Sequence, residues 1–211
     1  MKKKSNLPSK TVSKFVHSVT ASKGLDSLGK RMIRSLGIAE ESVPAEIMTV
    51  EFDSLGCHYQ GIGVRNVNRG IQFCGTSFTH PQITLGNAGI TLLEQGKDRP
   101  SCVFFLTFMD YLHYVTSHPD NTTLRFSDII IVNDWENFYS AVRVCSKYEN
   151  VYCCLPGTLV GNMMFLTIRD VVKGYCKAVP FIRETPKDVS GDRVSLRETM
   201  LARPATAAVI V

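Results

Sequence analysis

The sequence predicts an α/β fold, in which a parallel β-sheet flanked by helices is preceded by a small region of one helix and antiparallel strands. After residue 100, short apolar strands alternate with amphipathic helices, which is typical of a parallel sheet covered on both faces. Between residues 47 and 93, short strands follow one another directly, which is typical of an antiparallel meander. Of the 211 residues, 44% are hydrophobic and 20% are charged, values that exclude a wholly disordered or fibrous chain.

The N-terminal part of the chain carries the positive charge. Residues 1–34 hold nine basic residues and one acidic residue, a net charge of +8, whereas the whole chain has a net charge of +5. The rest of the chain is therefore mildly acidic. Residues 1–24 are rich in Ser, Thr and Lys, and we expect them to form a basic, flexible segment.

One helix and several short strands are predicted for residues 25–99. Within Leu25–Leu36, apolar residues recur at helical spacing, and Gly37 follows as a helix stop. Runs of β-forming residues, two of them separated by turn residues at Asn66–Arg69, indicate antiparallel strands. The predicted strands are Ile47–Phe52, Gly61–Arg65, Gly70–Cys74 and Ile90–Leu93.

Residues 100–183 are predicted to form an α/β domain. Each of three apolar strands is followed by a segment whose apolar residues lie on one helix face. These strands are Cys102–Leu106, Asp128–Asn133 and Asn150–Leu155. Residues 184–211 form a polar tail that ends in the apolar run Ala205–Val211, which is either an added edge strand or disordered.

The cysteines and the apolar stretches indicate a cytoplasmic protein. The seven cysteines cannot all pair, several lie in apolar runs, and none has the spacing of a zinc site. No apolar signal-peptide segment follows the N-terminal lysines. Residues 150–168 are uncharged and nearly long enough to cross a bilayer, but Pro156 and Gly157 interrupt them. We therefore expect a strand and a helix there, and no membrane partner.

Several short motifs between residues 59 and 161 resemble those of one known family. Val103–Leu112 (VFFLTFMDYL) resembles the first motif of the Toprim domain, the metal-binding catalytic module of topoisomerases and bacterial-type primases. Tyr59–Asn66 is similar to the region before the Toprim domain in primase-like proteins carried on bacterial mobile elements. Asp128–Asn133 and Asn150–Gly161 resemble the second and third strands. The resemblance covers residues 31–180 and implies a Toprim-like (Rossmann-like) sheet and a role in DNA replication or mobilisation.

The chain departs from that family where the family binds its metal. The resemblance places a glutamate and a glycine at the positions of Leu106 and Thr107, and an Asp-x-Asp at Pro156 and Thr158. Gly161, near the start of the next helix, does match. Magnesium requires oxygen ligands, which Leu and Pro side chains do not supply. We therefore expect a degenerate site with no catalytic residue and no bound metal; nothing matches the family's N-terminal zinc-binding domain either.

Three other acids follow the predicted strands. Asp110, Asp134 and Glu136 could form a substitute magnesium site at the same edge of the sheet. The simpler interpretation is that Asp134 caps the helix beginning at Trp135 and that Glu136 favours the positive end of that helix. We expect a magnesium cofactor only if these acids form such a site.

The basic N-terminal segment, together with basic residues further along the chain, could contact nucleic-acid phosphates. A helix and a strand region each contribute some of them, and nearby aromatic residues could stack on bases or pack in the core. The candidates are Lys30, Arg31, Arg34, Arg65 and Arg69, with Tyr59, Phe73 and Phe78 as the aromatic residues. The alternative is an ordinary solvated helix face.

Three functions remain open on the sequence. The first is a non-catalytic, primase-related protein that binds nucleic acid or a replication or mobilisation protein. The second is an active magnesium-dependent nucleotidyl-transfer enzyme of the primase type. The third is a protein-interaction scaffold that uses the uncharged edge around Leu106 and Leu155–Leu159.

Overall fold

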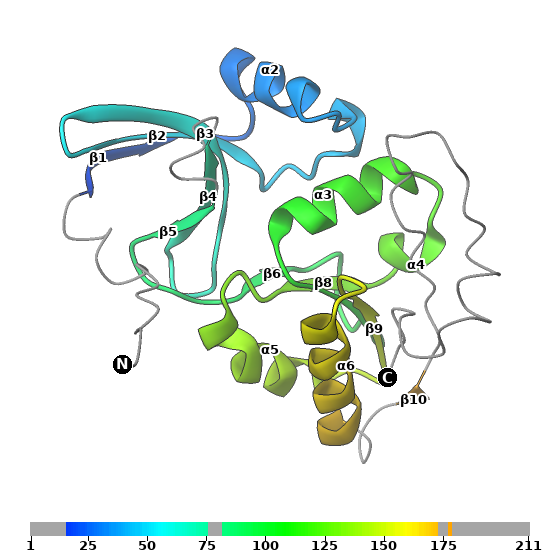
Figure 1. The fold of residues 1–211 in the computed structure, drawn as a ribbon. Helices are drawn as coiled ribbons and strands as arrows, with labels where there is room; N and C mark the ends of the chain where they lie inside the picture. The colour runs from blue at the N-terminus through cyan, green and yellow to red at the C-terminus, as the bar shows by residue number, and fades with distance from the viewer. Residues whose placement is uncertain (1–15, 76–81, 173–176, 179–211) are drawn as a thin grey trace, which may run out of the picture. The chain divides into compact units, whose positions relative to one another are not determined.

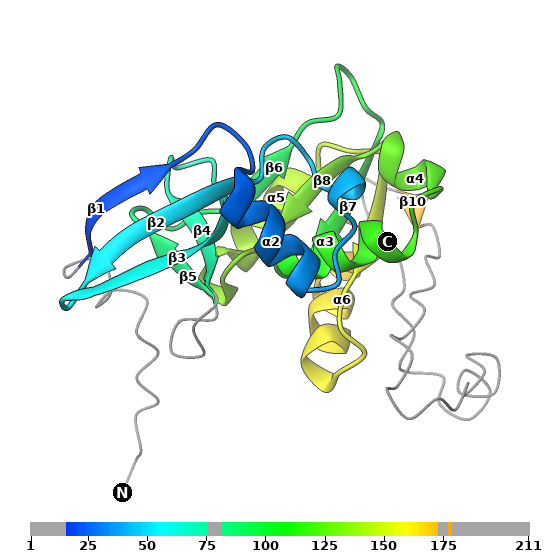
Figure 2. The same ribbon diagram turned by 90° about the horizontal axis from the view of Figure 1, so that it is seen from above.

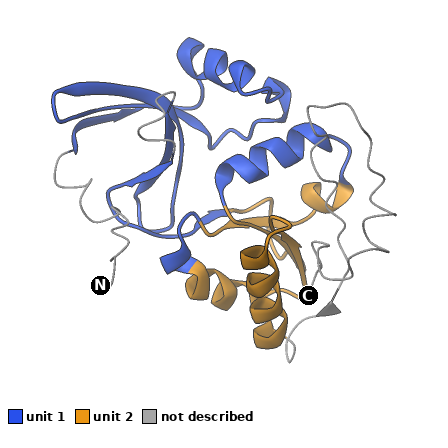
Figure 3. Ribbon diagram, in the orientation of Figure 1, with its two compact units in different colours: residues 1–92, 107–121, 133–137 blue, residues 93–106, 122–132, 138–211 orange. Residues whose placement is uncertain are grey.

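The computed structural model describes residues 16–75, 82–172 and 177–178. The chain divides into two compact units, coloured separately in Figure 3. The first unit contains residues 1–92, 107–121 and 133–137, and the second contains residues 93–106, 122–132 and 138–211. The first unit thus includes two segments from the range 100–183, which the sequence predicts to be one α/β domain. Residues 1–15, 76–81 and 184–211, and with them Phe78, lie outside the described residues.

The first unit is built on a five-stranded antiparallel sheet (Figure 1). Its strands are adjacent in chain order, which confirms the predicted meander except for its last strand: Ile90–Leu93 is predicted to belong to it, but β6 (Thr91–Leu93) pairs in the second sheet. The strands are β1 (Val16–Ala21), β2 (Met48–Ser54), β3 (Cys57–Arg65), β4 (Ile71–Gly75) and β5 (Ile83–Leu85). Strand β1 falls within residues 1–24, where the sequence predicts flexibility, and it pairs along β2. The sequence does not predict β5 either.

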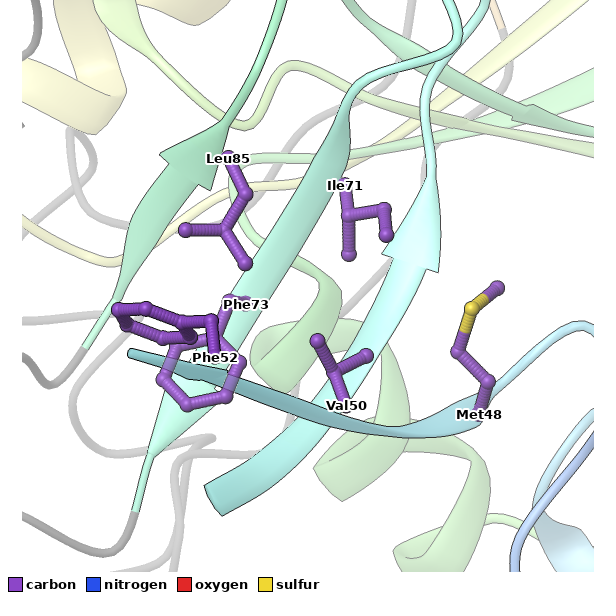
Figure 4. Close-up of a cluster of buried hydrophobic side chains, with 6 residues drawn as sticks. All are labelled: Met48, Val50, Phe52, Ile71, Phe73 and Leu85. Carbon is purple, nitrogen blue, oxygen red and sulfur yellow. The ribbon is translucent and has the colours of Figure 1, made fainter. Parts of the chain in front are cut away.

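A cluster of buried hydrophobic side chains lies on one face of this sheet (Figure 4). Alternate residues of β2 and β4 point to this face because side chains alternate along a strand. The cluster consists of Met48, Val50, Phe52, Ile71, Phe73 and Leu85. Phe73 packs edge-on against Phe52, with ring centroids 5.0 Å apart. A Cβ at Gly61 of β3 would overlap the Phe73 ring, so this position requires glycine. Core packing is therefore the role of Phe73.

Helices in the first unit are α2 (Ser27–Ser35), the 3₁₀ turn η1 (Glu40–Ser42) and α3 (Phe108–Ser117). Asp26 caps α2: its Oδ1 atom accepts hydrogen bonds from the N–H groups of Leu28 at 2.9 Å and Gly29 at 3.0 Å. The hydrogen bond from the Gly29 N–H is the main cause of the lowered pKa of Asp26, and a hydrogen bond from the Thr49 side chain also lowers it. Helix α2 packs against β2 and β3 (Figure 2). The predicted helix Leu25–Leu36 is confirmed.

The second sheet has the strand order β10-β9-β7-β8-β6. Strand β7 is parallel to both β8 and β9, and β10 is parallel to β9. The strands are β6 (Thr91–Leu93), β7 (Ser101–Phe105), β8 (Asp128–Ile131), β9 (Asn150–Cys154) and β10 (Lys177–Ala178). The helices of the second unit are α4 (Thr122–Arg125), α5 (Phe138–Cys145) and α6 (Leu159–Val172), while the 3₁₀ turn η2 (Trp135–Asn137) belongs to the first unit. The mixed α/β class predicted from the sequence is confirmed.

The uncharged stretch 150–168 forms β9, a loop and the first part of α6, as predicted. Within the described residues, no helix combines the length and the apolar character that crossing a membrane requires. Helices α5 and α6 lie side by side in the second unit (Figure 1). The expected burial of cysteines is confirmed for Cys74, Cys102, Cys145, Cys153 and Cys154.

A buried carboxylate fixes the start of β8. Asp128 is 6% exposed, and its Oδ1 atom accepts a hydrogen bond from the backbone N–H of Gln95 at 2.8 Å. Its Oδ2 atom accepts one from the Tyr148 hydroxyl at 2.9 Å. Burial and this hydrogen bond raise the pKa of Tyr148 well above its ordinary value. A buried carboxylate is costly unless such donors satisfy it.

We expect Tyr148→Phe to lower the free energy of unfolding by about 1–3 kcal/mol, because Oδ2 of Asp128 loses its hydroxyl donor while packing is retained. Urea unfolding followed by circular dichroism measures this loss. Tyr139→Phe is the matched control: Tyr139 is 74% exposed, and removing its hydroxyl should change stability by less than about 0.5 kcal/mol. Equal losses in both variants would contradict the role assigned to Tyr148.

Candidate nucleic-acid interface

In the second unit, the loops that follow β7 and β9 present no carboxylate. Leu106 directly follows β7 and is partly buried. Leu155, which follows β9, is 2% exposed, and the half-buried Pro156 comes next. Neither Leu106 nor Pro156 has a side-chain oxygen, so these positions offer nothing to a hard dication.

The polar side chain of the β9 loop, that of Thr158, is hydrogen-bonded to the start of α6. The Thr158 hydroxyl accepts a hydrogen bond from the N–H of Gly161 at 3.2 Å, and the Thr158 carbonyl accepts one from Asn162 at 2.9 Å. A Cβ at Gly161 would collide with the Pro156 carbonyl, so glycine permits this close loop-to-helix approach. Thr158 therefore serves as the cap of α6.

In the first unit, Thr107 and Asp110 form a capping box at the start of α3. The Thr107 hydroxyl accepts from the N–H of Asp110 at 3.1 Å, and the Asp110 carboxylate accepts from the N–H of Thr107 at 3.1 Å. The Thr107 hydroxyl also donates to this carboxylate at 2.8 Å. This reciprocal pairing satisfies two backbone donors that the first helical turn leaves without partners. Asp110, one of the three acids proposed to form a substitute magnesium site, thus bonds to the start of α3.

Asp134 also bonds to the backbone that follows it. Its Oδ1 atom accepts a hydrogen bond from the N–H of Glu136 at 3.2 Å, and its carbonyl accepts one from Asn137 at 2.9 Å. Glu136 is exposed in the first turn of η2. Capping is thus the role that the geometry gives Asp134. Across the part of the chain that the structure describes, no group of three or more His, Cys, Asp or Glu residues could hold a metal ion.

Two of the cations proposed on α2 are already paired with an acid. Lys30 lies 2.6 Å and Arg34 lies 3.3 Å from the carboxylate of Glu40. The hydrogen bond from Lys30 is the main cause of the lowered pKa of Glu40. These three residues together carry a charge of +1, which weakens α2 as an anion-binding surface. Arg31, by contrast, is exposed.

The turn between β3 and β4 is braced by a buried amide. Asn66 is 6% exposed, and its Oδ1 atom accepts hydrogen bonds from the N–H groups of Asn68 at 3.0 Å and Gly70 at 2.9 Å. The Asn66 carbonyl accepts from Arg69 at 3.1 Å. Arg69 has a φ of +65°, in the left-handed region that non-glycine residues rarely adopt. The brace therefore holds Arg69 in one backbone conformation.

A second loop, which contains Asn87 and Ala88, is hydrogen-bonded to this turn. The Asn66 amide donates to the Asn87 carbonyl at 2.7 Å, and the Asn68 amide donates to the Ala88 carbonyl at 2.6 Å. A Cβ at Gly70 would collide with the Asn87 carbonyl, so glycine is required where the loops meet. The two loops thus form one cross-linked structure, which we call the asparagine-braced turn (residues 65–70 and 87–88).

An open hollow of about 490 Å³ lies on the asparagine-braced turn. Among the described residues that line it, none is acidic and one is cationic: the lining consists of Val67, Asn68, Arg69, Asn87 and Ala88. Arg65, the last residue of β3 and the first of the asparagine-braced turn, is exposed, and so is Arg69. Two exposed arginines, four positions apart in the sequence, therefore lie at a rigid part of the first unit.

Asn133 adds to the hydrogen bonds of this region within the first unit, a role that the sequence did not reveal. Its amide donates to the Gly89 carbonyl at 3.0 Å and to the Thr91 hydroxyl at 2.9 Å. Thr91 in turn donates to the Arg65 carbonyl at 3.3 Å. The sequence treats asparagines here only as turn residues; the Asn-x-Asn pattern followed by glycine was the available signal of a side-chain brace.

No protein-family model matches this sequence, and no curated protein matches it. A crystal structure of the primase fragment of the bacteriophage T7 primase-helicase protein is similar to this chain, with a TM-score of 0.43 and 12% sequence identity. The similarity covers 78% of this chain and 67% of that chain. This TM-score is too low to establish a common fold.

We expect Asn66→Ala to lower the free energy of unfolding by about 1–3 kcal/mol, because two backbone N–H groups of the turn lose their acceptor. Hydrogen exchange at Asn68 and Gly70 should become faster. Urea unfolding and exchange mass spectrometry measure the two effects. In the control Asn87→Ala, an exposed amide loses one 3.3 Å bond, and stability should change by less than about 0.5 kcal/mol. Unchanged exchange in Asn66→Ala would refute the brace.

Proposed function

We propose that this protein is a Toprim-like relative of the primases of mobile elements, which has lost metal-dependent catalysis and binds nucleic acid during DNA replication or mobilisation. The motif Val103–Leu112 supports the relationship, since it spans the end of β7 and the start of α3. Parallel pairing of β7 with β8 and β9 is compatible with such a domain. The observation that carries the binding function is the pair of exposed arginines, Arg65 and Arg69, on the asparagine-braced turn.

The arginines suit a phosphate backbone for two reasons. A guanidinium keeps its charge at all physiological pH values and donates hydrogen bonds in a fixed fork that matches phosphate oxygens. The braced backbone around Arg69 reduces the conformational entropy that binding costs. The hollow of about 490 Å³ beside Arg69 falls within the size range of ligand sites, about 300–1,000 Å³.

Loss of catalysis follows from the chemistry of the strand ends. Phosphoryl transfer in a Toprim-like site needs carboxylates that hold magnesium near the reacting phosphate. Leu106 and Pro156 provide no oxygen, and the Thr158 hydroxyl is bonded to the start of α6. The chain's own residues at these positions therefore fit neither the metal nor its chemistry, and we assign them no catalytic step.

The binding proposal is tested by fluorescence anisotropy with labelled single-stranded and double-stranded oligonucleotides over a range of salt concentrations. We expect affinity to fall steeply with salt, because phosphate contacts release counterions. Arg65→Gln and Arg69→Gln should each weaken binding and reduce the slope of log affinity against log salt by about 0.7–0.9. No binding of either oligonucleotide at low salt would end this proposal.

Two further variants test whether oligonucleotide binding depends on particular arginines or only on the net charge of the protein. Arg143→Gln removes one exposed cation from α5 and should leave the salt slope unchanged. Glu40→Gln should strengthen binding or leave it unchanged, because it releases Lys30 and Arg34 from their acid. If Arg143→Gln weakened binding as much as Arg69→Gln, the arginines of the asparagine-braced turn would have no special role.

The alternative of an active nucleotidyl-transfer enzyme requires Asp110 and Asp134 to bind a metal while they cap their helices. We expect no primer synthesis and no strand nicking with either Mg²⁺ or Mn²⁺. Product formation that disappears in Asp134→Asn, with folding retained by circular dichroism, would reverse this expectation. Product formation unaffected by Asp134→Asn would point to a contaminating enzyme.

The third alternative, a protein-interaction scaffold, is favoured by one observation. Helix α6 begins at the end of the uncharged β9 loop, and its outer face is apolar and exposed. This function is compatible with nucleic-acid binding, since the arginines belong to the first unit and α6 belongs to the second.

A further inference from the structure

Helix α6 is apolar on both of its faces. Its inner residues are buried in the second unit: Gly161, Met164, Ile168 and Val172. Its outer residues are 44–76% exposed: Leu159, Val160, Met163, Leu166 and Val171. The spacing of Leu159, Met163 and Leu166 places them on one side of the helix, one turn after another. A solvent-facing helix side normally carries polar residues, and a helix that is apolar all round is normally covered.

The outer face is also free of charge over most of its length. Residues 159–168 contain no Asp, Glu, Lys or Arg. The first charged residues of the helix are Arg169 and Asp170, which lie 3.0 Å apart and neutralise each other. Such a surface has no attraction for nucleic acid and offers no charge with which to select an oppositely charged partner.

An uncharged apolar face is complementary to itself. In a two-fold symmetric pair, the same surface patch meets on both subunits, so a patch with net charge would bring like charges together. The outer face of α6 meets this requirement, because it has no unbalanced charge to repel a second copy. Burying its aliphatic side chains against their counterparts removes apolar surface from water, which is the main driving force of association.

We propose that the outer face of α6 (Leu159, Val160, Met163, Leu166 and Val171) is the interface of a two-fold symmetric dimer of this chain. The two copies of α6 pack against each other, with Met163 near the symmetry axis because it lies between Leu159 and Leu166. The dimer does not depend on nucleic-acid binding. It places two asparagine-braced turns in one assembly.

Analytical ultracentrifugation of the full chain tests the dimer over about two decades of concentration. We expect a monomer–dimer equilibrium, and we expect Leu159→Asp and Met163→Asp to raise its dissociation constant at least about 100-fold, since each would bury a carboxylate in an apolar interface. Leu55→Asp is the matched control, because Leu55 is 75% exposed and Leu159 is 76% exposed. The Leu55→Asp variant should associate like the unchanged chain.

Cysteine cross-linking locates the interface independently. In a background in which Cys57 and Cys176 are replaced by serine, Met163→Cys should form an intermolecular disulfide with diamide, which accepts the two electrons and two protons of the two thiols. Leu55→Cys in the same background should not do so. Residues near a two-fold axis meet their own copies, whereas Leu55 lies in the turn between β2 and β3.

Two results would overturn the proposal. The first is a monomer at every concentration without a Met163→Cys cross-link, which would assign the face to another segment or protein. The second is a dimer that persists in Leu159→Asp and Met163→Asp. Circular dichroism of these variants should match the unchanged chain, since both residues are exposed. Anisotropy measurements on them separate the two proposals, because a monomeric variant should still bind a short oligonucleotide.

Discussion

Backbone N–H groups at the ends of strands and helices must find acceptors, and in this protein loop side chains supply many of them. Asp26, Thr107 and Thr158 cap helices, and Asn66 performs the same task inside a strand-to-strand turn. Each of these side chains is thereby held in one orientation. The same requirement determines how rigid the loops are and which polar atoms remain for a ligand.

The same requirement determines the role of the acids near the strand ends. Asp110 is an acid at a position compatible with a metal site, but its carboxylate bonds to Thr107. Asp134 accepts from the backbone of Glu136 in a similar way. A carboxylate used as a cap can still carry charge, but moving it to a metal would leave backbone donors without acceptors. Both carboxylates therefore stabilise helix starts.

Pairing with acids also determines which basic residues can attract an anion. Glu40 pairs with Lys30 and Arg34, which takes two cations of α2 out of the surface that attracts anions. Arg65 and Arg69 lie instead on a turn whose asparagine brace uses amides rather than carboxylates, so no acid of the brace offsets them. The uncharged stretch from β9 into α6 has two consequences. The loop at its start carries no carboxylate, and the helix further along has an apolar outer face.

The sequence by itself determined the alternation of strands and helices, because hydrophobic periodicity is a local property of each segment. It also determined that the side chains of Leu106 and Pro156 offer no oxygen ligand, since side-chain chemistry does not depend on the fold. It did not reveal β1, which has few buried residues and is held by pairing with β2. Only the tertiary structure could pair Glu40 with two cations of α2, or bring Asn66 to the Asn87 carbonyl, 21 positions further along the chain. Contacts of this kind depend on the path of the backbone between the two residues, and local sequence pattern carries no information about that path.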